Sequence, residues 1–164
     1  MKKKKSRLLY NDFLPDHEFV EWLDIIKKQV VWQYRQGKLK GTPLSFDPTN
    51  DFSFTQAYWR PLEGPLPTRE GEVIYPFIMK LLSYLRVDGI LRIRLNMDLP
   101  RSEHFETGYH TDLGEDFEYK TAIFYFNDCN GYTQFEIDKA PVKSKANRLL
   151  LFDGRMRHQA VIQT

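Results

Sequence analysis

The sequence predicts an α+β domain in which two helices precede an antiparallel sandwich or barrel of at least six strands. Three observations support this prediction. Apolar residues recur at helical spacing in two segments before residue 88. From residue 90 onwards the pattern changes to alternating and β-favouring runs separated by tight turns. The length of 164 residues and the aromatic content of 15% suit one domain with an aromatic-lined core.

The first helix is expected within residues 14–33. Pro15 and Asp16 open it, and Glu18 lies in the first turn, where a negative charge suits the helix dipole. Its apolar side chains recur every three or four residues, which gives the helix one face to bury. These side chains are Phe19, Trp22, Leu23, Ile26 and Val30.

The second helix is expected within residues 72–87, with Pro76 near its first turn, where a missing amide proton is tolerated. Between the helices, residues 35–51 contain glycines and prolines without a period and predict a long loop. Residues 52–64 predict a short strand. The apolar face of the second helix consists of Phe77, Ile78, Leu81, Leu82 and Leu85.

The sequence pattern predicts strands throughout the second half of the chain. Ile and Leu alternate with Arg and Asn in residues 90–99, which is typical of a half-buried strand, and Asn130-Gly131 is a strong signal for a tight turn. The expected strand segments are 90–99, 107–112, 120–128, 130–138, 140–154 and 157–164.

Composition excludes several classes of protein. The net charge is +2, and much of it comes from the lysines of residues 1–7, which we expect to form a disordered basic tail; the balance argues against a nucleic-acid partner. Cys129 is the single cysteine, which fits a reducing cytoplasm and excludes an intrachain disulfide. No apolar run is long enough for a membrane span, and no secretory signal is present. We therefore expect a soluble, cytoplasmic protein with no membrane partner.

Three residues in this half could bind one metal ion. His110 and Asp112 are two apart, so on an extended strand their side chains point to the same face. His158 lies on a distant predicted strand. Two imidazoles and one carboxylate on one face of an octahedral ion leave positions open, which suits Fe(II) enzymes that bind a co-substrate and oxygen. Each histidine taken alone is more often a hydrogen-bonded structural residue.

The order of four segments gives these residues a context. "GYHTD", "KTAIFYFND", "NGYTQFE" and "ANRLLLFDGRMRH" follow one another within residues 86–164. In the order and spacing of these four segments, the chain resembles the 2-oxoglutarate- and Fe(II)-dependent dioxygenases of the prolyl-4-hydroxylase-like branch. It is most similar to the short members encoded by tailed bacteriophages, especially those of marine cyanobacteria. The resemblance implies a double-stranded β-helix (jelly-roll, cupin-like) core over residues 88–164, with a helical part, residues 8–87, on one face of a single domain.

The resemblance also implies the ligands. His110, Asp112 and His158 would hold Fe(II), and 2-oxoglutarate would be the co-substrate, with ascorbate as a possible reductant. Tyr125, in Tyr-Phe-Asn, matches a family Tyr-Leu-Asn whose tyrosine can bond 2-oxoglutarate; a tyrosine that fills the core is an equal alternative. The stretch from Gly131 to Phe135 matches a turn and strand that close the barrel.

One departure concerns the co-substrate. The family has an Arg or Lys beyond the second histidine that pairs with the distal carboxylate of 2-oxoglutarate. The chain ends at Thr164, so that residue and the last strand are expected to be missing. Truncation, a substitute cation or loss of 2-oxoglutarate binding would each explain it. Arg94 and Asn96 are the proposed co-substrate contacts, and Arg92 and Lys120 are further cations. Strand residues of this kind are more often ordinary solvent-facing side chains.

The resemblance implies an oxidoreductase that uses O2 to hydroxylate a C–H bond of a peptide or protein, with a prolyl residue as the suggested target. Fold analogy is a weak guide to substrate. An encoding phage would place the protein in the host cytoplasm. Two alternatives stay open. One is a catalytically silent jelly-roll binding or virion-associated module, and the other is a cupin-like metalloenzyme that does not use 2-oxoglutarate.

Overall fold

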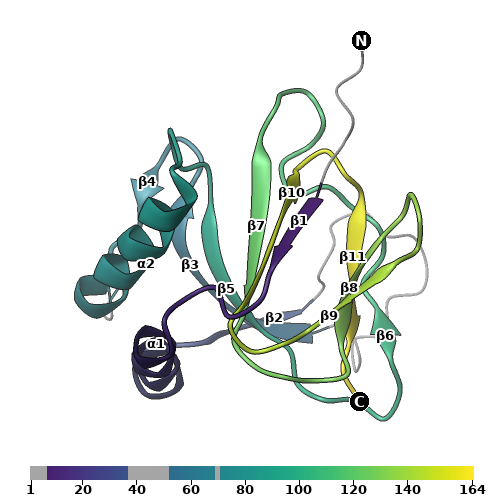
Figure 1. The fold of residues 1–164 in the computed structure, drawn as a ribbon, viewed down its shortest axis with the longest axis horizontal. Coiled ribbons are helices and arrows are strands. Elements are labelled where there is room, and N and C mark those ends of the chain that lie inside the picture. Colours follow the sequence, from purple (N-terminus) through teal and green to yellow (C-terminus); the bar gives the residue numbers. More distant parts are fainter. Residues whose placement is uncertain (1–6, 37–51, 69–70) are drawn as a thin grey trace. The chain divides into compact units, whose positions relative to one another are not determined.

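The structure, a computed structural model, describes residues 7–36, 52–68 and 71–164. These residues form two helices and eleven strands, most of the strands in the second half of the chain (Figure 1). Contacts divide them into two units. Unit 1 contains residues 7–16 and 99–164, and unit 2 contains residues 17–36, 52–68 and 71–98. The single domain predicted for residues 8–164, with its two parts meeting between residues 87 and 88, stays a prediction.

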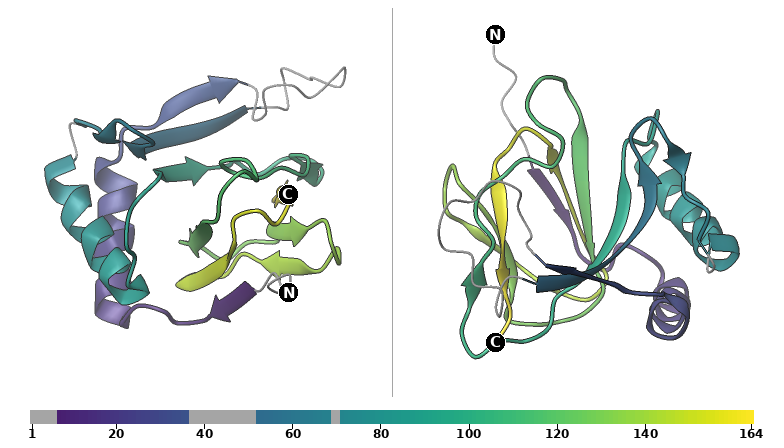
Figure 2. Two further views of the ribbon diagram at one scale, coloured as in Figure 1. Left: turned by 90° about the horizontal axis from the view of Figure 1, so that it is seen from above. Right: turned by 180° about the vertical axis from the view of Figure 1, so that it is seen from behind.

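Both predicted helices are present in unit 2 (Figure 2). Helix α1 (Asp16–Gln29) begins at the predicted Asp16. Helix α2 (Gly71–Leu85) begins where the Gly71 amide donates to the Thr68 carbonyl. The prediction for Pro76 was wrong, because the first turn starts at Gly71 and the proline falls in the second turn, inside the helix.

Side chains from both helices hold unit 2 together. The rings of Trp22 on α1 and Phe77 on α2 pack edge to face with centroids 5.3 Å apart. The buried Glu18 carboxylate lies 2.9 Å from Lys80 Nζ, and this ammonium lowers the pKa of Glu18. The Tyr75 hydroxyl of α2 lies 2.5 Å from the carbonyl of the fully buried Tyr58, which ties the helix to the sheet.

The sheet of unit 2 is built around one long strand. Strand β3 (Phe52–Arg60) pairs antiparallel with β2 (Gln33–Gln36), β4 (Gly64–Pro65) and β5 (Ile93–Met97). The strand predicted within residues 52–64 is therefore β3 with β4, and the strand predicted within 90–99 is β5. The first two residues of the predicted loop, 35–36, belong to β2, and its remainder lies outside the described residues.

Unit 1 contains two sheets. The order of one is β1-β10-β7 and that of the other is β6-β11-β8-β9, with antiparallel pairing throughout. Arg7, expected in the tail, is the first residue of β1. The strands are β1 (Arg7–Tyr10), β6 (Phe105–Glu106), β7 (Lys120–Tyr125), β8 (Tyr132–Phe135), β9 (Pro141–Lys143), β10 (Arg148–Asp153) and β11 (His158–Ile162).

The core of unit 1 forms where the two sheets face each other. Phe135 of β8 and Phe152 of β10 are buried and pack edge to face, with centroids 5.0 Å apart. Leu150 of β10 and Ile123 of β7 are cross-strand partners, so their side chains lie on the same face of the sheet. Both side chains pack in this core. His158 pairs with Phe135 and therefore borders this core.

The fold is thus mostly β-sheet with two helices, which confirms the predicted helices and strands at that level. Neither helix among the described residues is long and apolar enough to cross a membrane. The placement of the helices against the strands of unit 1 stays a prediction.

Candidate metal centre

Backbone pairing brings the two candidate histidines together. The His110 amide donates to the His158 carbonyl and the His158 amide donates to the His110 carbonyl, each at 2.9 Å. Such a reciprocal pair sets two side chains on the same face of a sheet, and the ring centroids are 4.8 Å apart. The Thr107 amide also donates to the Ala160 carbonyl at 3.0 Å, but no continuous ladder forms, so the strand predicted over residues 107–112 is wrong and an isolated bridge at His110 takes its place.

Hydrogen bonds to backbone carbonyls fix both imidazole rings. His110 Nδ1 lies 3.1 Å from the Gly108 carbonyl, and His158 Nδ1 lies 3.0 Å from the Met156 carbonyl. A carbonyl accepts only, so each Nδ1 carries the proton and each Nε2 presents a lone pair. Gly108 has a φ of 83°, a conformation that favours glycine. Both rings thus have the tautomer that metal-ligating histidines use.

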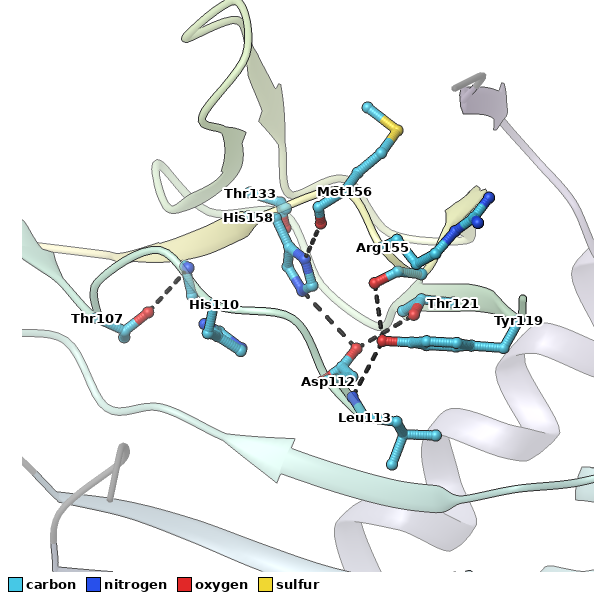
Figure 3. Close-up of polar contacts among 12 residues, drawn as sticks. Thr107, His110, Asp112, Leu113, Tyr119, Thr121, Thr133, Arg155, Met156 and His158 are labelled. Atoms are coloured by element: carbon cyan, nitrogen blue, oxygen red, sulfur yellow. Dashed lines mark hydrogen bonds and ion pairs between the residues drawn. The ribbon is translucent and has the colours of Figure 1, made fainter. Parts of the chain in front are cut away.

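Asp112 completes the group from a bend in the following loop. Its Oδ2 lies 3.8 Å from His158 Nε2 and 3.3 Å from Thr121 Oγ1, which donates to it (Figure 3). The His158 side chain is 6% exposed and that of Asp112 is 15% exposed. The site is therefore sheltered from water but not sealed.

The donor set fits a divalent metal. One ligand atom from each of His110, Asp112 and His158 lies within 4.8 Å of the others. Ligand atoms on one face of an octahedral ion with bonds of about 2.1 Å lie roughly 3 Å apart, so the 3.8 Å between Asp112 Oδ2 and His158 Nε2 has to shorten by about 1 Å when a metal binds. Two neutral imidazoles and one carboxylate with open positions match the facial triad of Fe(II) enzymes.

Tyr125 points into the same core from β7. Its hydroxyl lies 2.7 Å from Thr133 Oγ1, and burial raises the pKa of Tyr125 to about 12. The phenol therefore stays protonated at neutral pH. Thr133 pairs with Ala160, two positions beyond His158, so the Thr133 and His158 side chains lie on the same face of this sheet. The contact of Tyr125 with a co-substrate stays a prediction.

The other predicted co-substrate residues lie in unit 2. Arg94 and Asn96 are neighbours on one face of β5, opposite Ala57 and Thr55 of β3, and both are exposed. Their role toward the triad stays a prediction. Lys120 opens β7 within unit 1, and it is exposed opposite Asp153.

Charged residues around the turn before His158 form pairs with one another. Arg155 binds the Asp153 carboxylate through two nitrogens, at 3.0 and 2.9 Å, and it lies 3.6 Å from Glu118. Its guanidinium lowers the pKa of Asp153 to about 2. Arg157 pairs with Glu136 at 2.9 Å. Arg155 therefore partly neutralises the acidic side chains of residues 115–118 through its pair with Glu118.

Sequence reasoning missed two residues that contact the Asp112 loop. Thr121 bonds the carboxylate, and the Tyr119 hydroxyl bonds the backbone beside it. No periodicity or motif distinguishes either residue. A threonine followed by an apolar run after a His-x-Asp pair is the only signal available for Thr121.

Comparisons with known proteins support the fold. No protein-family model and no curated protein matches the chain. Among solved structures, the chain is similar to a prolyl hydroxylase from Trichoplax adhaerens, determined in complex with a peptide fragment of the oxygen degradation domain of hypoxia inducible factor. The TM-score is 0.55 at 16% sequence identity, and the match covers 96% of this chain and 77% of that one. The likeness shows a shared fold, with the candidate His-Asp-His site assembled on it.

Proposed function

We propose that the protein is a non-haem Fe(II)- and 2-oxoglutarate-dependent dioxygenase that hydroxylates a C–H bond. The observation that supports this most strongly is the assembly of His110, Asp112 and His158, whose candidate ligand atoms lie within 4.8 Å of one another while backbone carbonyls hold both Nδ1 atoms. In this proposal the two sheets of unit 1 form a double-stranded β-helix, and the fold shared with a prolyl hydroxylase supports that assignment.

Bound Fe(II) and 2-oxoglutarate would supply the oxidising chemistry, coupling decarboxylation of 2-oxoglutarate to hydroxylation by O2, with ascorbate as a possible reductant. The chain itself holds the ligands. The Gly108 and Met156 carbonyls orient the two imidazoles, and Thr121 orients the Asp112 carboxylate. Phe135 and Phe152 exclude water from the inner side of His158.

The co-substrate would extend from the triad towards Tyr125. Its protonated hydroxyl can donate to a carboxylate, and Thr133 beside it offers a second hydroxyl. Arg94 and Asn96 stay candidates for further contacts. Tyr125 has the stronger support, because it lies in the same unit and the same core as His158.

The substrate would be a peptide or protein. Support comes from the similar prolyl hydroxylase, whose structure contains a peptide. A hollow of about 300 Å³ beside the turn before His158, lined by Glu115, Glu136, Ile137, Arg155, Met156 and Arg157, would take part of the chain around the target residue. The order of the four sequence segments supports a short phage-type member that acts in the host cytoplasm.

The experiment is anaerobic titration of the protein with Fe(II) and 2-oxoglutarate, followed by visible absorption spectroscopy. We expect a weak charge-transfer band that is absent in His110→Ala and present in His17→Ala, a matched control whose imidazole lies in unit 2. Conversion of 2-oxoglutarate to succinate in air would separate an active enzyme from a silent binding module. Metal binding without the band would favour a metalloenzyme that does not use 2-oxoglutarate. Equal Fe(II) affinity in both variants would overturn the proposal.

A further inference from the structure

The backbone pairing that holds His110 does not extend to Asp112. The backbone bridge holds His110, but Asp112 lies in a bend outside any strand. Thr121 Oγ1 donates to the carboxylate at 3.3 Å, a long hydrogen bond. Contacts that hold the backbone after Asp112 therefore help to fix the position of the carboxylate relative to His158.

The Tyr119 hydroxyl holds that backbone. Its oxygen accepts the Leu113 amide at 3.0 Å, directly after Asp112. The same oxygen lies 2.8 Å from the Gly154 carbonyl and 3.1 Å from the Gly114 carbonyl, to either of which it can donate its proton. Figure 3 shows Tyr119 lying between the Asp112 loop and the turn that leads to His158.

The Tyr119 backbone and ring also fix the turn before His158. The Gly154 amide donates to the Tyr119 carbonyl at 2.9 Å. A Cβ on Gly154 would lie 2.0 Å from Tyr119 Cε2, far inside contact distance, although the φ of Gly154 is outside the left-handed region. The glycine is therefore required for space against this ring and not for backbone conformation.

We propose that Tyr119 is a positioning residue for the metal centre. Its hydroxyl joins the loop that contains Asp112 to the turn that precedes His158, so that two ligands from distant segments keep a fixed separation before a divalent metal binds. The inference rests on the proposed function in one respect, namely that the triad binds a metal. It adds a residue that contacts neither metal nor substrate.

The first test compares Tyr119→Phe with the wild type and with Tyr132→Phe, a matched control whose ring packs against His104. Mn(II) is the probe, and free Mn(II) is measured by electron paramagnetic resonance. We expect Tyr119→Phe to weaken Mn(II) binding about 10-fold, within the range for groups that support metal ligands. Tyr132→Phe should bind as the wild type does. Amide hydrogen exchange of metal-free protein should be faster at Leu113 in Tyr119→Phe only.

A second test keeps the proposal falsifiable if Tyr119→Phe loses stability. Gly154→Ala should lower the unfolding midpoint and weaken Mn(II) binding, because the new methyl group displaces the ring. In a Tyr119→Ala background, Gly154→Ala should lower the unfolding midpoint and the Mn(II) affinity much less, because the ring is absent. If Gly154→Ala lowers the unfolding midpoint and the Mn(II) affinity equally in both backgrounds, the Tyr119 ring does not pack on the turn.

The outcomes separate this inference from the proposed function. If the wild type binds Mn(II) and Tyr119→Phe binds it equally well, the positioning role is overturned and the metal centre stands. If the wild type binds no divalent metal, the proposed function and the positioning role both fail. In that case, faster amide hydrogen exchange at Leu113 in Tyr119→Phe would still show that the Tyr119 hydroxyl holds the Asp112 loop. Unchanged exchange at Leu113 would show that the hydroxyl does not hold this loop either.

Discussion

The interior of unit 1 has two polar ends that differ in how their hydrogen bonds are used. At one end, the Nδ1 atoms of His110 and His158 hydrogen-bond to backbone carbonyls, and His158 Nε2 lies 3.8 Å from the Asp112 carboxylate. At the other end, the Tyr125 and Thr133 hydroxyls bond each other at 2.7 Å. The first end gathers three side chains that could hold a metal ion, while a ligand at the second end must share or replace an existing hydrogen bond. The metal side of the proposed site is therefore better supported than the co-substrate side.

The largest expected effect tests the core that lies between the two ends. Phe135→Ala should lower the free energy of unfolding by about 3–5 kcal/mol, because a fully buried ring that contacts Phe152 is removed. Ile137→Ala, at a side chain that is 75% exposed, should change it by less than about 0.5 kcal/mol. Urea denaturation measures both. Similar losses in the two variants would contradict a shared core around Phe135.

The next effect tests the metal end. His158→Ala should weaken Fe(II) or Mn(II) binding more than about 100-fold, or roughly 2.7 kcal/mol, because one of three ligands is lost. His104→Ala removes an imidazole from the same unit, whose Nδ1 lies 2.8 Å from the Ile162 carbonyl, and should leave the affinity unchanged. Anaerobic calorimetry gives both values. A triad that does not bind metal would show no difference between the two variants.

A smaller effect tests the other end. Tyr125→Phe should weaken 2-oxoglutarate binding roughly 10-fold, about 1.4 kcal/mol, and leave the metal affinity unchanged, because a hydrogen-bond donor deep in the core is removed. The measurement is titration of 2-oxoglutarate into the Mn(II)-loaded protein. An unchanged affinity would mean that Tyr125 only fills the core, the alternative that the sequence left open.

The smallest effect tests the turn beside the metal end. Arg155 lowers the pKa of Asp153 to about 2 from an unfolded value near 3.9, so the unfolded chain binds more protons between these values. The stability that this pair contributes, on the order of 1 kcal/mol, is present above pH 4 and is lost as the pH falls towards 2.

Asp153→Asn should lack this component of the pH dependence, and Asp88→Asn, at an exposed position after α2, should retain it. Thermal unfolding at pH values between 2 and 6 measures the difference. Parallel curves for Asp153→Asn and the wild type would mean that the Asp153–Arg155 pair does not stabilise the folded state.

Much of this arrangement could be predicted from local patterns. Helical spacing predicted α1 and α2, and alternation predicted most strands of the second half, because burial of one face imposes a period on the sequence. The residue types and spacing made His110, Asp112 and His158 candidates, and the resemblance carried by the four sequence segments named them as a triad. Asp112 was expected on the strand of His110, yet it lies in a bend, because the pairing with His158 ends after one residue.

The sequence by itself determined the candidate donor set, two imidazoles and one carboxylate, since these residue types limit which metals could bind. Only the tertiary structure decided which nitrogen each ring presents, because the carbonyls of Gly108 and Met156 become acceptors through local backbone geometry. The same holds for Tyr119 and Gly154, whose contact joins segments that are far apart in the chain. Such contacts depend on the path of the backbone, which no period in the sequence encodes.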